Sequence, residues 1–477
     1  MSAMSRCLFI LILASTLATV ACRDASFPAS NQTKNAYQVV TLADLHFNPL
    51  YDPSLYTQLV ADDPSRWAAI YQGSRITAPT GGGTDTNYPL LGLALAGVKQ
   101  RMGNSPVVLL TGDLLGHYIP TTFYTAYYYP SSVPSTPSPA AVTAMQQFID
   151  KTVVFVAQQV RAAVGSAPVV FSVGNIDTYD LEALGPDITF LTNNAHTIYT
   201  QFAGNTVDEP TFVSTFTSGG YYSAQSLGSN LRVISLNSNS FVAAAPTSAD
   251  ADAELFWLNA QLAQAQGAGQ KVWILMHVPA GANSQATAQN AMRAGTPSAV
   301  SEQIAEMMWN PANQDTFLQM LANYPGLVTL MLAGHTHMDE YRILSAGNIL
   351  EQLPSISPCF GNNPAFKVFT IDRTTLAAID YQSYYFNLSS APSPTQFATL
   401  YQFSDAYGAE GSLSASLQQL YPLLGEDPTQ RNTYTHNFVS STTASPWNPI
   451  TSATWPIFAC TINQMDEANY IHCVNTY

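Results

Sequence analysis

The sequence predicts a layered α/β fold, because short apolar runs of strand type alternate along the chain with longer segments of helical spacing. The short runs are nearly continuous in apolar residues, as expected for strands that are buried on both faces. They lie at 39–47, 107–115, 168–173, 231–237, 271–278 and 327–333. The helical segments between them include 141–163, 251–266 and 301–323.

The N-terminus has the pattern of a secretory signal. Arg6 precedes an apolar run at 7–20 that ends in small residues. We therefore expect residues 1–22 to be a signal peptide, residues 23–37 to be a linker, and the protein to be secreted, extracellular or periplasmic. The residues before Cys22 also resemble a lipoprotein processing site, so lipidation of Cys22 is an alternative to ordinary cleavage. Membrane contact is expected only through such a lipid.

The charge balance excludes one broad class of partner. Lys and Arg number 16 against 31 for Asp and Glu, which gives a formal net charge of −15. A phosphate-rich polymer would be repelled rather than attracted, so nucleic-acid polymers are not expected partners.

Two long stretches rich in Pro, Gly, Ser and Tyr interrupt the alternation, at 62–88 and 118–138. Loops of this length are usually functional or disordered. The second stretch follows a polar motif directly, which favours a wall of a binding site over a solvated insertion. After residue 385 the strand pattern fades and 394–424 has helical spacing, so the sequence predicts a main domain at 38–385 and a C-terminal helical subdomain at 386–477.

Five of the predicted strands end in Asp, His or Asn. Because ligands of open α/β sheets bind at the carboxyl ends of the strands, these side chains are expected at one edge. They are Asp44, His46, Asp113, Asn175, His277, His335 and His337.

This set has the chemistry of a metal centre. Residues two apart on an extended chain point to the same side, so Asp44 and His46 can reach one ion together. Imidazole and carboxylate ligands suit Zn, Mn or Fe, and two ions about 3.5–4 Å apart can clamp the attacking and leaving oxygens of a phosphoryl displacement. Asp113 follows a glycine that permits a tight turn, and it is the candidate bridging carboxylate.

These motifs resemble the signature of calcineurin-like metallophosphoesterases: Asp-Leu-His, Gly-Asp, Gly-Asn, an isolated His277 and Gly-His-Thr-His. His117, four residues after Asp113, and Pro-Ser-Ile-Ser-Pro at 354–358 with Gly-Asn-Asn-Pro-Ala-Phe at 361–366 resemble the acid sphingomyelinase-like phosphodiesterase branch. The resemblance implies a four-layer α/β fold in which two mixed β-sheets are sandwiched between helices.

The resemblance also implies roles for single residues. One ion would be held by Asp44, His46, Asp113 and His337, and the other by Asp113, Asn175, His277 and His335. Zn is the usual metal of this branch, and a water activated by the ions would attack phosphorus. The spacing of Cys460 and Cys473 is similar to a C-terminal disulfide of the branch. Cys359 is interpreted as a small buried apolar residue.

The chain departs from the family pattern at Ile176, where the superfamily usually has a catalytic His. Isoleucine has no proton to donate, so His117 is the expected substitute, with Asp113 as the second catalytic residue. The ordinary pKa of histidine, near 6.5, suits acid catalysis. The alternative is a metal-binding module of the same fold that has lost catalysis.

The expected activity is hydrolysis of soluble phosphodiesters, or of phosphomonoesters, such as nucleotides or choline-phosphate-like head groups. Full sphingomyelinases carry a Cys-rich saposin-like segment before the catalytic region, whereas only a few polar residues lie between Cys22 and Val39. Sphingomyelin is therefore the alternative substrate rather than the expected one. We expect the enzyme to act as a monomer.

Overall fold

The computed structural model describes residues 35–103, 105–225, 227–228, 230–245, 248–391, 393–442 and 450–477. The predicted signal peptide, Cys22 and nearly all of the predicted linker lie outside the described residues. No helix within these ranges is long and apolar enough to cross a membrane.

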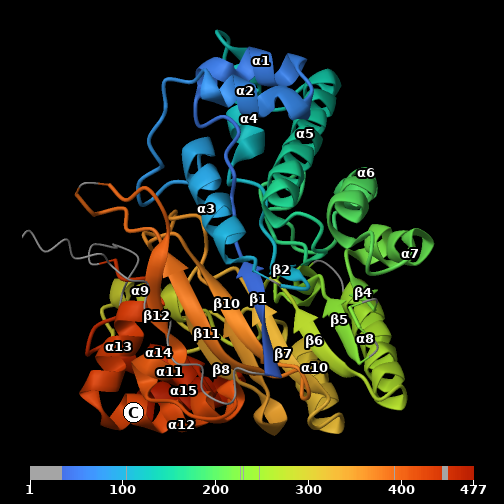
Figure 1. The fold of residues 1–477 in the computed structure, drawn as a ribbon. Helices are drawn as coiled ribbons and strands as arrows, with labels where there is room; N and C mark the ends of the chain where they lie inside the picture. The colour runs from blue at the N-terminus through green and yellow to red at the C-terminus, as the bar shows by residue number, and fades with distance from the viewer. Residues whose placement is uncertain are drawn as a thin grey trace, which may run out of the picture.

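Within the described residues, two mixed β-sheets of six strands each form the centre of the fold (Figure 1). The first has the order β12 (Ala398–Gln402), β11 (Ala378–Tyr385), β10 (Ala365–Asp372), β1 (Ala36–Leu42), β2 (Val108–Leu110), β3 (Val169–Phe171). The second has the order β4 (Tyr222–Ala224), β5 (Leu231–Ser235), β6 (Lys271–Leu275), β7 (Val328–Ala333), β9 (Ile349–Gln352), β8 (Glu340–Ile343). In the first sheet β1, β2 and β3 are parallel, whereas β10, β11 and β12 pair antiparallel. The predicted fold class is confirmed.

Helices pack outside both sheets (Figure 1). At the top of the view lie α1 (Tyr56–Ala61), α2 (Trp67–Gln72), α3 (Tyr88–Arg101), α4 (Ile119–Tyr128) and α5 (Pro139–Val164). The helices that follow in the chain are α6 (Ile188–Ile198), α7 (Glu209–Gly219), α8 (Ala249–Gly267), α9 (Ser284–Arg293) and α10 (Pro311–Asn323). The C-terminal helices are α11 (Phe403–Tyr407), α12 (Leu413–Glu426), α13 (Pro428–Phe438), α14 (Trp455–Thr461) and α15 (Glu467–Thr476).

The longest helix illustrates how local sequence sets the boundaries. Ser138 caps the start of α5 by accepting a hydrogen bond from the main-chain N–H of Ala141, and Pro139 occupies the first turn. The helix ends at Gly165, whose φ of 66° is readily adopted only by glycine.

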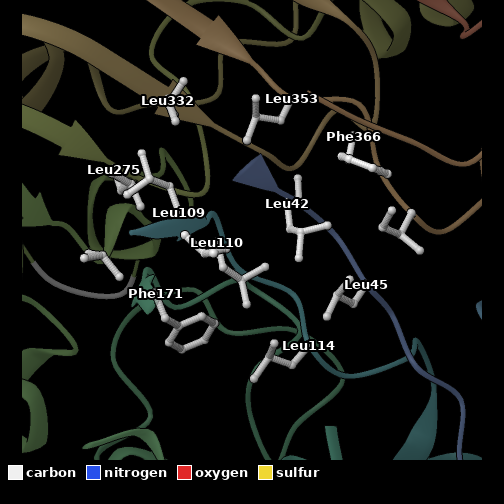
Figure 2. Close-up of a cluster of buried hydrophobic side chains, with 14 of the residues drawn as sticks. Leu42, Leu45, Leu109, Leu110, Leu114, Phe171, Leu275, Leu332, Leu353 and Phe366 are labelled. Carbon is white, nitrogen blue, oxygen red and sulfur yellow. The ribbon is translucent and has the colours of Figure 1, made fainter. Parts of the chain in front are cut away.

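Side chains from strands of both sheets meet in one buried cluster (Figure 2). Leu42, Leu110 and Phe171 come from the first sheet, and Leu275 and Leu332 come from the second; all are at most 1% exposed. Burying a side chain of this size stabilises the fold by about 1.5–3 kcal/mol. This core holds the strand ends, and with them the polar motifs, in fixed positions.

Several element predictions were wrong. The stretches at 62–88 and 118–138 were predicted to be irregular, but they contain α2 and α4. Trp67 and Phe123 are fully buried and pack against Phe148 of α5. Tertiary packing of these aromatic anchors therefore overrides the turn-forming composition of the stretches.

Two helical predictions were also wrong in part. Helix α10 starts only at Pro311, after Asn310 caps it, so residues 301–310 are not helical. The 394–424 segment contains strand β12, which pairs antiparallel with β11 and extends the first sheet. The C-terminal region therefore contributes a strand to the main sheet as well as the helices α11 to α15.

Candidate metal centre

The structure brings all seven predicted ligands to one edge of the two sheets. Five of them have a left-handed backbone, with φ between 39° and 73°: Asp44, His46, Asp113, His335 and His337. Such a conformation costs a non-glycine residue of order 1–3 kcal/mol and is found mainly at functional sites. The chain turns sharply just beyond each strand, which aims these side chains inward.

The ligands form two groups that share one carboxylate. The first half consists of Asp44, His46 and His337: His46 Nε2 lies 3.0 Å from His337 Nε2, which lies 3.5 Å from Asp44 Oδ1. The second half consists of Asn175, His277 and His335, in which Asn175 Oδ1 lies 2.7 Å from His277 Nε2 and 3.1 Å from His335 Nδ1.

Asp113 lies between the halves. Its Oδ2 atom is 3.3 Å from His46 Nε2 and 3.1 Å from His277 Nε2. Its Oδ1 atom accepts a hydrogen bond from the main-chain N–H of Ile176 at 2.8 Å. One oxygen is thus held by the protein and the other faces both halves, which is the arrangement required of a bridging ligand.

Backbone carbonyls fix the orientation of two imidazoles. The Nδ1–H of His46 donates to Leu115 O at 2.9 Å, and the Nδ1–H of His277 donates to Thr111 O at 2.7 Å. When either ring is neutral with its proton on Nδ1, its Nε2 lone pair points into the centre. Asp44 Oδ2 is buried with no hydrogen-bond partner among the described residues. A bound cation would satisfy both the Nε2 lone pairs and the carboxylate oxygen of Asp44 that has no hydrogen-bond partner.

Electrostatics supports the same conclusion. Burial lowers the pKa of His46 to about 4 and that of His335 to about 3, so both are neutral, the form that binds metal. Burial also disfavours the charged form of His277, but Asp113 beside it raises its pKa to about 9. Burial raises the pKa of Asp44 to about 8, so that carboxylate needs a positive charge nearby to stay ionised. The residues therefore fit two divalent ions that share Asp113.

His117 lies beside the first half. Its ring stacks on that of His46 with centroids 4.1 Å apart, and its side chain is 23% exposed. The Nδ1 atom lies 2.8 Å from Asp85 Oδ1, and the main-chain N–H of His117 donates to Asp85 Oδ2 at 2.6 Å. Burial works against the charged ring, but the hydrogen bond and charge of Asp85 raise the pKa of His117 above its ordinary value.

Sequence reasoning missed Asp85, which comes from the 62–88 stretch and has no motif around it. The adjacent Thr86 is bonded to the first metal motif, since its N–H donates to His46 O at 3.1 Å. A side chain at Gly116 would be crowded, because a Cβ there would lie 3.1 Å from Asp85 Oδ2 and 3.0 Å from Phe47 O. Sequence reasoning also missed Asp177, which is buried two residues after Asn175 and accepts hydrogen bonds from the main chain of Asp113.

Ile176 lies beside the second half and is 8% exposed. Among the described residues, the histidines of the centre are His117 and the four of the predicted ligand set.

Cys359, interpreted as a buried apolar residue, is only partly buried, and its Sγ lies 3.4 Å from His337 Nδ1. Burial and nearby carboxylates raise the pKa of its thiol well above the ordinary range, so it is a poor nucleophile.

Far from the centre in sequence, Cys460 and Cys473 form a disulfide with Cα atoms 5.9 Å apart. It joins α14 to α15, close to the C-terminus. The cross-link restricts the unfolded chain rather than shaping the metal centre.

The two mixed sheets and the paired ligand groups resemble those of the calcineurin-like metallophosphoesterase superfamily, whose members are metal-dependent phosphoric ester hydrolases. Within that superfamily the chain resembles acid sphingomyelinase-like phosphodiesterases. It is 25% identical over 458 residues to cyclic GMP-AMP phosphodiesterase SMPDL3A of Rattus norvegicus, a match that covers 91% of each chain.

Other comparisons are shorter or more distant. Sphingomyelinase phosphodiesterase C of Dictyostelium discoideum is 26% identical over 243 residues, 46% of this chain and 49% of that protein. Sphingomyelin phosphodiesterase of Homo sapiens is 25% identical over 291 residues, 56% of this chain and 41% of that protein. No protein-family model matches the chain. A dimetal phosphatase from Danio rerio aligns with a TM-score of 0.39 at 12% identity, covering 76% of this chain and 98% of that one.

Proposed function

We propose that the protein is an exported dinuclear zinc enzyme that hydrolyses phosphodiester bonds of soluble substrates. The observation that carries the proposal is the position of Asp113 Oδ2, within 3.3 Å of one imidazole from each half of the centre. Nitrogen and oxygen ligands of this kind suit Zn, and they also suit Mn or Fe. The disulfide between Cys460 and Cys473 supports export, because such bonds persist in oxidising compartments.

Two divalent ions held by these residues would supply a nucleophilic water and positive charge for the phosphoryl oxygens. The chain's own contributions are positional and proton-transferring. Asp113 keeps the halves at a fixed separation, and Asn175 places a neutral oxygen in the second half. The Nδ1–H of His117 is held by Asp85, so Nε2 is the atom that can donate a proton to the leaving oxygen.

The surroundings of His117 support a substrate with a flat or cationic leaving group. Tyr118 follows it directly, is 65% exposed and has its ring centroid 6.1 Å from that of His117. An exposed tyrosine face can stack on a nucleobase or bind a quaternary ammonium group. Nucleotides and choline-phosphate-like head groups both fit this requirement. The names of the relatives, which act on cyclic GMP-AMP or sphingomyelin, agree with phosphodiester chemistry.

A second candidate is a metal-binding module that has lost catalysis, which Ile176 favours because it supplies no proton. The intact His117–Asp85 pair argues against this candidate, since a module that only binds metal has no use for an oriented proton donor.

The proposal is tested by metal analysis of the purified protein together with hydrolysis of bis-p-nitrophenyl phosphate. We expect about two ions per chain, and for Asp113→Ala a fall in rate of roughly 10³-fold or more, because Lewis-acid stabilisation is worth several kcal/mol. Asp180→Ala is the matched control, since Asp180 is an exposed carboxylate outside the centre. Wild-type protein that purifies without metal and hydrolyses nothing contradicts the proposal. Two bound ions without hydrolysis favour the binding module.

A further inference from the structure

Asp177 is a buried carboxylate, 1% exposed, on which main-chain N–H groups from two loops converge. Its Oδ2 atom accepts from Asp113 at 2.9 Å and from Gly174 at 2.9 Å. Its Oδ1 atom accepts from Leu114 at 2.8 Å and, more weakly, from Leu115 at 3.4 Å. The first loop follows β2 and carries Asp113, and the second follows β3 and carries Asn175.

The two loops are so close that only glycine fits between them. A Cβ at Gly174 would lie 2.0 Å from Asp113 Oδ1, and a Cβ at Gly112 would lie 2.8 Å from Gly174 Cα. At this separation the N–H of Ile176 reaches Asp113 Oδ1, which leaves Oδ2 directed at His46 and His277. The direction of the bridging oxygen therefore depends on the distance between the loops.

We infer that Asp177 is the positioning residue that holds Asp113 Oδ2 at the shared corner of the two metal positions. This role rests on the proposed two-ion function, but it concerns how the ions are coupled rather than turnover. Asp177 contacts neither the ligand atoms of the two halves nor the substrate side of His117. It acts through the main chain of Asp113 and Gly174.

The chemistry of the contact explains why a carboxylate is needed. Both oxygens of Asp177 accept hydrogen bonds, and each faces main-chain donors. In Asp177→Asn, one of these oxygens becomes an amide NH₂ that faces N–H donors and cannot accept from them. The substitution preserves size while removing half of the contact, so the loops are expected to shift apart.

The test uses Mn²⁺ as the probe, with the wild-type and Asp177→Asn proteins stripped of metal and titrated. In the wild type, two Mn²⁺ ions joined by Asp113 give an exchange-coupled electron paramagnetic resonance signal. In Asp177→Asn we expect one ion to bind roughly 10–100-fold more weakly, as for other groups that orient metal ligands, and the coupled signal to be replaced by that of isolated Mn²⁺.

Asp187→Asn is the matched control. Asp187 also accepts hydrogen bonds from main-chain N–H groups, those of Tyr179 and Phe190, but only within its own segment. We expect it to keep both ions and the coupled signal. Asp177→Glu provides a second variant in case Asp177→Asn fails to fold, because it keeps both acceptors but is one methylene too long for the same gap.

The inference is overturned by either folded variant at Asp177 that binds two Mn²⁺ ions with wild-type affinity and coupling. A wild-type protein that binds only one ion also contradicts it. An active site that couples two ions but hydrolyses no ester contradicts the proposed function alone, so the two failures are distinguishable.

Discussion

The two halves of the metal centre have similar ligands but different neighbours. The first half lies against His117, an imidazole oriented by Asp85 and stacked on His46. In the second half, Asn175 is followed by Ile176, whose side chain has no donor. Residues suited to metal binding therefore lie on both sides, whereas the proposed proton donor, His117, lies on one side only. The leaving group of a substrate is expected to depart next to the first half, where its oxygen can be protonated.

The strongest test of this difference removes the donor. His117→Ala is expected to lower the rate about 10²–10⁴-fold for a substrate with an alkoxide leaving group, because that oxygen must be protonated as it departs. The rate for a substrate whose leaving group is p-nitrophenolate should fall much less, because this anion is stable without a proton. Steady-state rates on the two substrates, with metal content measured in parallel, check the prediction. Equal losses on both substrates would show that His117 supports the centre instead of donating a proton.

A smaller effect is expected when the orienting carboxylate is changed. In wild-type protein the two oxygens of Asp85 accept from the main-chain N–H and from the Nδ1–H of His117. Asp85→Asn keeps only one oxygen, so one of these two hydrogen bonds is lost. Losing a hydrogen bond to a charged group costs about 1.5–3 kcal/mol, which corresponds to a loss of roughly 10–100-fold in rate. The loss should again be larger for the alkoxide leaving group, with two ions still bound. If Asp85→Asn instead loses bound metal, Asp85 is a metal ligand rather than a residue that orients His117.

The smallest effect is expected at Ile176. Because His117 is the proposed proton donor, Ile176→His should change the wild-type rate by less than about threefold. In the His117→Ala background the same change should raise the rate on the alkoxide substrate by less than about threefold, because residue 176 belongs to the loop of the second half and the leaving oxygen is expected at the first. A large gain in the wild-type background would mean that His117 is a poor acid and that the two halves are not functionally different.

Local pattern carried much of the fold and the predicted ligand set. The strands β1, β2, β3, β6 and β7 are short apolar runs with polar residues just beyond their ends, and this pattern is visible without knowing which strands are neighbours. Parallel strands bring their carboxyl ends to one edge, so a polar residue at each end suffices to predict that they meet. The helices α2 and α4 were missed because their stability depends on packing Trp67 and Phe123 against α5.

The sequence by itself determined which residues can bind metal, since Asp, His and Asn at strand ends have that chemistry wherever the strands lie. Only the tertiary structure decided how those residues are oriented. Asp85 reaches His117 from a separate segment, and Asp177 joins the loop of Asp113 to that of Asn175 through main-chain hydrogen bonds. Such contacts carry no pattern in the sequence, because any carboxylate has the same local chemistry until folding places donors around it.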